Sequence, residues 1–408
     1  MRKTFRYETG ASKVKYLIIA ALLFLQLISY ADANQGYPQS QQNKQNLQDS
    51  NEEYEKAGHQ IVAALSSGDA KAFGLAIDKE ALLDRVFDGM SQDTKRVKKI
   101  RGELYGALDQ VSTIMTKNLR ENALLTFVRS RSIGSEHRAL TRVDMGDRGL
   151  NYLDFILQKD KAGTVRIIDW HDYARGRIYT DSLRQALVIM LPDEKTLIEK
   201  LLGKDKVGRK AAKQFAELSR LARQQKYAEW LRKYDDVSEK IKYSRLTLVT
   251  RVMMTSAISD NDQYRLALKD VHKYLGDDPT LSLVLLDYYF YEGDLKAAHR
   301  ALDRLDEYTG GDAAIDGFRA NIFLTEKNYP ESIRYAQRAI EQDARYEGAY
   351  WTLLDASVDA KQYQTSVEAI KQLERHFGYA FNPKKLANTK GYEGFAGSAA
   401  FAKWKDPK

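Results

Sequence analysis

Cysteine is absent from the 408-residue chain, and proline and histidine are scarce, with six of each. Without thiols the protein has no disulfide, no thiol nucleophile, no zinc–thiolate site and no iron–sulfur cluster. Lipoprotein anchoring is excluded too, because that modification needs a thiol at the cleavage site. The few prolines, together with 29% charged residues, favour helices over a loop-rich β fold.

Long blocks of one charge sign are absent as well. The formal net charge is +8, and residues 1–33 hold five basic and two acidic residues of that balance. Basic and acidic residues alternate through the rest of the chain. A mildly basic, mixed surface is typical of solubility more than of nucleic-acid binding, so we expect no nucleic-acid partner.

Short motifs of common chemistry are also missing. Residues 205–408 contain no Gly-rich phosphate loop, no His-Glu zinc helix and no Gly-x-Ser-x-Gly elbow. We therefore expect no metal and no cofactor, and no catalytic set in this half of the chain.

The N-terminus has the three parts of a secretory signal peptide. Residues 2–15 are basic, residues 16–29 (YLIIAALLFLQLIS) are almost wholly apolar, and residues 31–33 (ADA) offer small side chains for cleavage. The apolar run gives roughly 21 Å of helix, which is short for a hydrocarbon core of roughly 30 Å. We expect a signal peptide over 1–33 and a periplasmic or secreted protein. The alternative is an uncleaved inner-membrane anchor over residues 16–30 that faces outward, the one case in which a membrane is a partner.

Residues 34–50 are rich in Gln and Asn and have almost nothing to bury. This composition predicts a flexible linker to the folded part of the chain.

Residues 51–200 predict an α+β domain. Apolar residues recur at helical spacing over 54–65, 70–90 and 93–118. The period then falls to two in three stretches joined by short Gly-containing turns, 136–145, 150–158 and 164–173. Three antiparallel strands after a set of helices are expected, followed by a helix over 179–190.

Two fragments of this domain carry a family resemblance. SSGDAKAFGLAIDKEALLDRVFDGM and the strand end RIIDWHDY resemble the opening helices and later strands of the cone-shaped fold shared by ketosteroid isomerase and nuclear transport factor. The resemblance covers about residues 51–190. It implies a curved meander sheet around a pocket where some members use His, Asp and Tyr, and it leaves open a homodimer formed through the sheet.

Polar residues of the last two predicted strands are the candidate pocket residues. By alternation Asp169, His171 and Tyr173 share one face of their strand, while Tyr152 and Asp154 share a face of the neighbouring one. A carboxylate beside an imidazole supplies a base and the group that orients it. The alternative is a wet strand end with a neighbouring tryptophan in the core, and we favour it because no other His or Asp spacing reinforces the set.

A repeat runs through residues 205–380. Loop-to-helix junctions are expected at intervals of 37, 31, 34 and 34 residues, at Tyr227, Tyr264, Leu295, Tyr329 and Tyr363. A period of 34 with two helices per unit resembles the tetratricopeptide repeat. Small residues stand three positions after the last four junctions, where two helices cross closely: Ala267, Ala298, Ser332 and Ser366. The sequence departs from the family pattern where large or polar residues replace core residues, at Trp230, Arg319 and Ser357.

The last residues, 381–408, have their own pattern. Phe395, Ser398, Phe401 and Trp404 recur every three residues. This predicts a segment that caps the open end of the last hairpin, because the end repeats of a solenoid must be covered. The alternative is a free aromatic tail that docks a partner.

Together these observations predict a mainly α protein: an α+β domain of helices and an antiparallel curved meander sheet, followed by a tetratricopeptide-like α-solenoid. Stacked hairpins imply a concave groove that binds peptides or helices. Tyr288, Tyr291 and Tyr350 are the candidate partner-binding residues, since tyrosine buries a large area and keeps a hydroxyl. We expect an exported adaptor or assembly factor that binds other cell-envelope proteins without catalysis of its own. The alternative is a small-molecule-binding protein or enzyme with its site in the middle domain.

Overall fold

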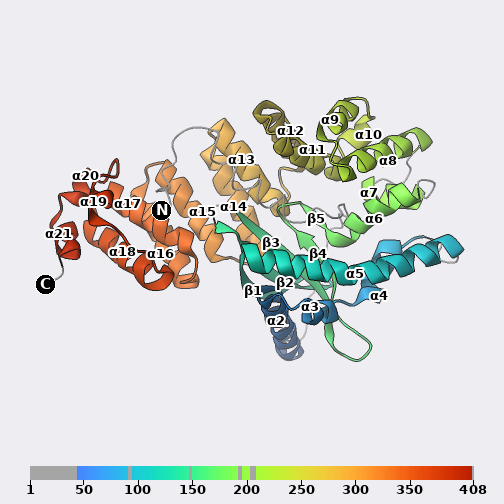
Figure 1. Ribbon diagram of the computed structural model, residues 1–408, viewed down its shortest axis with the longest axis horizontal. Coiled ribbons are helices and arrows are strands. Elements are labelled where there is room, and N and C mark those ends of the chain that lie inside the picture. Colours follow the sequence, from blue (N-terminus) through green and yellow to red (C-terminus); the bar gives the residue numbers. More distant parts are fainter. Residues whose placement is uncertain (1–43, 91–93, 147–148, 192–194, 203–207, 407–408) are drawn as a thin grey trace. The chain divides into compact units, whose positions relative to one another are not determined.

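The computed structural model describes residues 44–90, 94–146, 149–191, 195–202 and 208–406 (Figure 1). The described chain forms two compact units, and the boundary between them falls between Tyr288 and Tyr289, within helix α13 (Ser282–Glu292). Helices dominate both units, and one antiparallel sheet lies in the unit that ends at Tyr288. The predicted fold class, mainly α with an α+β domain and a following run of packed helices, is confirmed. In the described part of the chain no helix is long and apolar enough to cross a membrane.

Four helices open the described chain: α2 (Lys44–Ser67), α3 (Ala70–Ala76), α4 (Lys79–Phe87) and α5 (Lys95–Asn122). Helix α2 begins inside the stretch 34–50 that the composition suggested as a linker. Residues 70–90, expected as one helical stretch, form two helices. The break occurs because Ile77 leaves the helix to bridge Ile167, and the carboxylate of Asp78 then caps α4 by accepting from the Ala81 N–H.

The sheet is an antiparallel meander in the order β1-β2-β3-β4-β5. Its strands are β1 (Leu124–Ile133), β2 (Glu136–Asp144), β3 (Leu150–Lys159), β4 (Val165–Asp172) and β5 (Arg177–Ile178). The three predicted strands correspond to β2, β3 and β4. Strand β1 was not predicted, because LLTFVRSRSI has no clean alternation and a bulge interrupts its register between Phe127 and Arg129.

One face of the sheet forms the core of this unit with α2 to α5 (Figure 1). Phe155 and Trp170 are paired on neighbouring strands and both face the helices, where the ring of Phe73 meets Phe155 edge-on at 6.3 Å. Trp170 also stacks on Tyr179 at 3.9 Å. The aromatic residues of β3 and β4 therefore fix the sheet against the helices, because each buries a large apolar area.

The same unit continues with helices only. Helix α6 (Tyr179–Met190) has the bounds predicted from sequence. The others are α7 (Lys195–Leu202), α8 (Arg209–Arg223), α9 (Tyr227–Asp235), α10 (Glu239–Lys242), α11 (Arg245–Ala257), α12 (Asn261–Leu275), the 3-10 turn η2 (Pro279–Leu281) and α13.

The unit that starts at Tyr289 consists, in its described residues, of the end of α13 and of helices that pack in chain order. They are α14 (Leu295–Thr309), α15 (Ala313–Thr325), α16 (Tyr329–Gln342), α17 (Glu347–Asp359), α18 (Tyr363–Phe377), α19 (Pro383–Ala387), α20 (Glu393–Ala396) and α21 (Ala399–Lys405).

Five helices begin at a constant interval of 34 residues: α9 at Tyr227, α12 at Asn261, α14 at Leu295, α16 at Tyr329 and α18 at Tyr363. Two positions before each start, one residue has a positive φ between 55° and 69°, namely Gln225, Ser259, Gly293, Lys327 and Lys361. The junction expected at Tyr264 is therefore three residues too late. Asp260 caps α12 by accepting from the N–H of Gln263, which starts the helix at Asn261 and makes the first two intervals 34 as well.

The residue three positions into each of these helices is buried, but its size differs. It is Trp230 in α9 and Tyr264 in α12, then Ala298, Ser332 and Ser366 in the later helices. Ser332 donates to the carbonyl of Ala320 at 2.8 Å, which two closely crossing helices permit. The expected small residue is therefore present at this position in the three later helices, whereas the two earlier helices have a buried aromatic side chain there.

The C-terminal segment packs on the last hairpin. Phe395 and Phe401 are 1% and 4% exposed and lie in the same core cluster as residues of α17 and α18. Trp404 contacts Phe401 with ring centres 5.5 Å apart, and Ser398 caps α21. The three-residue spacing thus places apolar side chains against the helices.

Candidate functional site

The structure brings four of the five candidate pocket residues together. Asp154 and His171 are direct partners across β3 and β4. The hydroxyl of Tyr173 donates to Asp154 Oδ2 at 3.2 Å, and its ring lies 5.1 Å from His171 and 5.8 Å from Tyr152. Side-chain alternation, read from the sequence, therefore placed these residues on a common face of the sheet.

Asp154 is fully buried, and both oxygens of its carboxylate accept hydrogen bonds from neighbouring side chains. Arg131 donates to both oxygens at 3.0 and 2.8 Å, and Arg138 donates to Oδ2 at 3.2 Å. Two guanidinium groups and a tyrosine hydroxyl satisfy the charge, as a buried anion requires. A carboxylate held in this way anchors the strands and is poorly placed to accept a proton from a substrate. Arg131 was missed because it lies on β1, the strand that the sequence did not show.

His171 is kept neutral by its surroundings. Burial lowers its pKa well below the usual value, and the nearby charges of Arg245, Arg138 and Arg131 lower it further. Its Nε2 has no hydrogen-bond partner. Asp154, the partner of His171 in the sheet register, bonds to arginine and tyrosine, so the carboxylate–imidazole pair, the less favoured of the two hypotheses, is not formed. The favoured hypothesis, a wet strand end, is wrong for Asp169, because its side chain is fully buried.

Asp169 belongs to a different set of contacts. Its carboxylate accepts from the hydroxyl and the N–H of Thr180, at 2.5 and 3.0 Å, and lies 3.3 Å from Nε of Arg85. Burial raises its pKa, although the Arg85 charge opposes that change. Because Thr180 stands in the first turn of α6, Asp169 satisfies the start of that helix and interacts favourably with its dipole.

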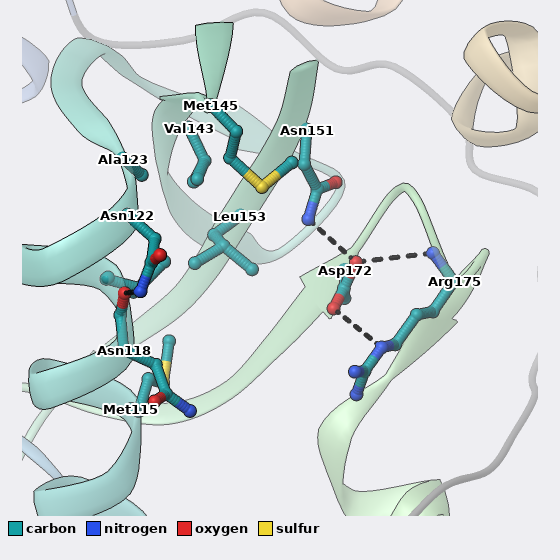
Figure 2. Close-up of a pocket in the computed structure, with 11 residues that line it drawn as sticks. Met115, Asn118, Asn122, Ala123, Val143, Met145, Asn151, Leu153, Asp172 and Arg175 are labelled. Carbon is teal, nitrogen blue, oxygen red and sulfur yellow. Dashed lines mark hydrogen bonds and ion pairs between the residues drawn. The ribbon is translucent and has the colours of Figure 1, made fainter. Parts of the chain in front are cut away.

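A small cavity lies on the opposite, helix-covered side of the sheet (Figure 2). It is lined by the end of α5 and by β2, β3 and the β4–β5 turn, and its volume is about 30 Å³. That is room for roughly two water molecules at 10–15 Å³ each. Its polar groups largely bond to one another: Asn151 donates to Asp172 at 2.9 Å, and Arg175 Nε lies 3.5 Å from the same carboxylate. The five candidate pocket residues do not line this cavity.

An open groove of about 430 Å³ lies elsewhere in this unit. Helices α3, α4 and α5 and the β3–β4 turn line it, and two apolar side chains are exposed in it, Leu75 at 62% and Tyr105 at 41%. Two pairs of charges at its rim are joined: Lys79 lies 2.6 Å from Asp109, and Arg166 lies 3.1 Å from Asp160. The ammonium of Lys79 also lies 5.0 Å above the ring of Tyr105. The groove is open, and most of the charged side chains that line it already take part in ion pairs or hydrogen bonds.

The three candidate tyrosines of the repeats have different environments. Tyr350 is 2% exposed, packs in the core of the α17–α18 pair and donates to the carbonyl of Ala344 at 3.1 Å. It is a core residue and is not available to a partner. Tyr288 and Tyr291 are partly exposed on α13, and the ring of Tyr288 stacks on His272 at 5.0 Å.

Two departures from the repeat pattern have a structural explanation. Arg319, buried at an expected core position, lies 2.8 Å from Asp303, 2.9 Å from Asp306 and 3.3 Å from Asp316. Three carboxylates from α14 and α15 thus neutralise it. Ser357 lies 2.8 Å from the hydroxyl of Ser366 across the α17–α18 pair.

The surface of α17 is partly covered by the chain itself. The rings of Tyr379 and Phe381 lie 5.1 and 5.7 Å from that of Trp351, and the hydroxyl of Tyr392 donates to Asp355. Residues 379–392 therefore cover Trp351 and Asp355 of α17, which would otherwise face solvent or a partner.

In the part of the chain that the structure describes, no group of three or more His, Asp and Glu side chains is arranged to hold a metal ion. Comparison with known protein families and with curated proteins finds no match to this chain.

Proposed function

We propose that the protein is an exported adaptor or assembly factor that binds other envelope proteins through tetratricopeptide-like helical pairs in its C-terminal half. One observation supports this most directly: five helices start at intervals of 34 residues, each after the same left-handed turn. A constant two-helix unit cannot bury its apolar side alone, and stacking such units creates an extended surface suited to peptides and helices.

The packing of the later helices suggests where a partner binds. Helices α15 and α17, the first helices of successive pairs, contact each other as well as α16. Asn321, Leu324 and Thr325 are at least partly exposed at the end of α15, while Trp351 and Asp355 on α17 are occupied by the C-terminal segment. We therefore place the partner contact on the α15 side of this surface.

Site-specific photo-crosslinking in cell envelopes tests the proposal. A photoreactive amino acid at the exposed Thr325 of α15 is compared with the same residue at the exposed Gln337 of α16. We expect discrete protein adducts from Thr325 that are absent from Gln337. Equal labelling at both positions, or no adduct at Thr325 in a folded and exported protein, contradicts the proposal.

The alternative, a ligand-binding or catalytic site in the α+β unit, has weaker support. The small cavity has room for only about two waters, Asp154 is neutralised by two arginines, and His171 lacks a carboxylate partner. A general base must lie within reach of a bound substrate, and neither Asp154 nor His171 lines the small cavity or the open groove.

A further inference from the structure

Helix α8 carries a dense set of positive charges on its solvent side. It holds five basic residues and one acidic residue: Arg209, Lys210, Lys213, Arg220, Arg223 and Glu217. At 100° per residue, Arg209, Lys213 and Arg220 fall within a narrow arc, and the other two cations flank it. The stripe from residue 209 to 223 is about 21 Å long.

The opposite side of α8 is fully engaged in the fold. Ala212, Phe215, Leu218 and Leu221 are buried there, so α8 cannot insert an apolar face anywhere else. Apart from the partly exposed alanines, the outward surface of the helix is polar along its whole length.

These cations have no carboxylate partner in the described structure. Arg220 donates to Gln224 at 2.9 Å, and Glu217 is itself 3.7 Å from Lys233 of α9. Ion pairs are common on the other helices, for example Lys371 with Glu368 and Arg334 with Glu331. The mixed surface expected from the sequence is therefore not uniform, and α8 carries a cluster of basic residues that no described carboxylate neutralises.

The position of two of these residues is unfavourable for the helix itself. Arg209 and Lys210 occupy the first turn of α8, which contains no acidic residue. The helix dipole favours anions there and disfavours cations. Folding alone gives no reason for this placement, whereas binding of an external anion removes the repulsion.

The chemistry of the stripe indicates the class of partner. Protein interfaces are depleted in lysine and centre on buried aromatic or apolar anchors, and single-stranded nucleic acids need aromatic stacking platforms. The outward face of α8 has neither. Long, flexible cations on a convex helix suit a surface of many mobile anions instead. We propose that α8 binds an anionic phospholipid surface electrostatically, without insertion and independently of the repeat surface.

Vesicle co-sedimentation of the chain from Asn34 onward tests the proposal, so that the apolar leader does not contribute. Vesicles of phosphatidylcholine alone are compared with vesicles that also contain phosphatidylglycerol. We expect sedimentation only with the anionic vesicles, weakening as salt is raised, because exposed charges are screened. Each cation near such a surface contributes about fivefold in affinity, so the triple variant Arg209→Glu, Lys213→Glu, Arg220→Glu lowers binding at least roughly 100-fold.

A matched control carries the same change in net charge elsewhere. Lys269, Arg375 and Lys384 are exposed on three other helices, and their reversal to Glu should leave most of the binding intact. A milder variant, Lys210→Gln with Arg223→Gln, should give a partial loss and serves if the triple variant does not fold. The proposal is overturned if the unmodified chain does not sediment with anionic vesicles, or if the control variant loses as much binding as the α8 variant. It is also overturned if the basic residues of α8 bind an acidic protein or an RNA but not the anionic vesicles.

Discussion

A single buried carboxylate should make the unfolding of the first unit depend on pH. Asp287 of α13 is 2% exposed, and the Tyr264 hydroxyl donates to its Oδ2 at 2.7 Å. Burial raises the pKa of Asp287 to about 7, although the hydrogen bond from Tyr264 lowers it. One hydrogen bond from a neutral hydroxyl stabilises a buried anion only weakly.

The sign follows from the two end states. In the unfolded chain this carboxyl has a pKa near 3.8, so the folded protein holds the proton more tightly. Its contribution to stability is complete below about pH 4 and is lost as the pH rises through 7. The two pKa values differ by about 3, which corresponds to roughly 4 kcal/mol in all, of which about 2.5 kcal/mol is lost between about pH 5 and pH 8.

Urea unfolding followed by circular dichroism, at several values in that pH range, measures the loss. The Asp287→Asn variant keeps the shape and the acceptor for Tyr264 but cannot ionise, so the gap between its stability and that of the unmodified protein should change by about 2.5 kcal/mol. Asp277→Asn, at an exposed position, is the matched control and should leave that pH dependence in place. Parallel pH profiles for the unmodified protein and Asp287→Asn would refute the reasoning.

Three further substitutions probe the packing. A Cβ on Gly317 would lie 2.3 Å from the ring of Tyr346, so Gly317→Ala should destabilise its unit by about 1–3 kcal/mol, with part of the loss recovered by adding Tyr346→Ala in the same melting assay. Trp230→Ala removes a side chain that is 1% exposed and should cost about 3–5 kcal/mol in urea unfolding, whereas a loss below about 1 kcal/mol would mean that the site is loosely packed. Asp154→Ala removes the carboxylate that Arg131 and Arg138 share, while Glu136 still pairs with Arg138, and should cost about 3–5 kcal/mol; a neutral effect would show that water reaches Arg131.

The local elements were largely predictable because their signals are local. Residues 179–190 form α6 with the expected bounds, and three of the five strands follow from alternation. Strand β1 was missed because its register contains a bulge, and α3 and α4 were merged because the break at Ile77 depends on a bridge to Ile167, 90 residues away in the sequence. A contact of that separation leaves no periodic pattern.

The candidate sites show the same division. Alternation placed His171 and Tyr173 on one strand face and Asp154 on a face of the neighbouring strand, but it could not show that Arg131 and Arg138 neutralise the carboxylate. Tyr350 has the same side chain as the partly exposed Tyr291, and only packing shows that it lies in the core. The basic stripe of α8 was not predicted, because its residues are separated along the chain by apolar ones and form one surface only in the helix.

By itself the sequence determined the helices, the meander and the 34-residue period, because capping residues, left-handed turns and hydrophobic periodicity act within a few positions. The tertiary structure alone decided which polar groups are neutralised and which charges remain unpaired. Those outcomes depend on contacts between side chains that lie far apart in the sequence. Such contacts determine which groups are buried and which charges are paired.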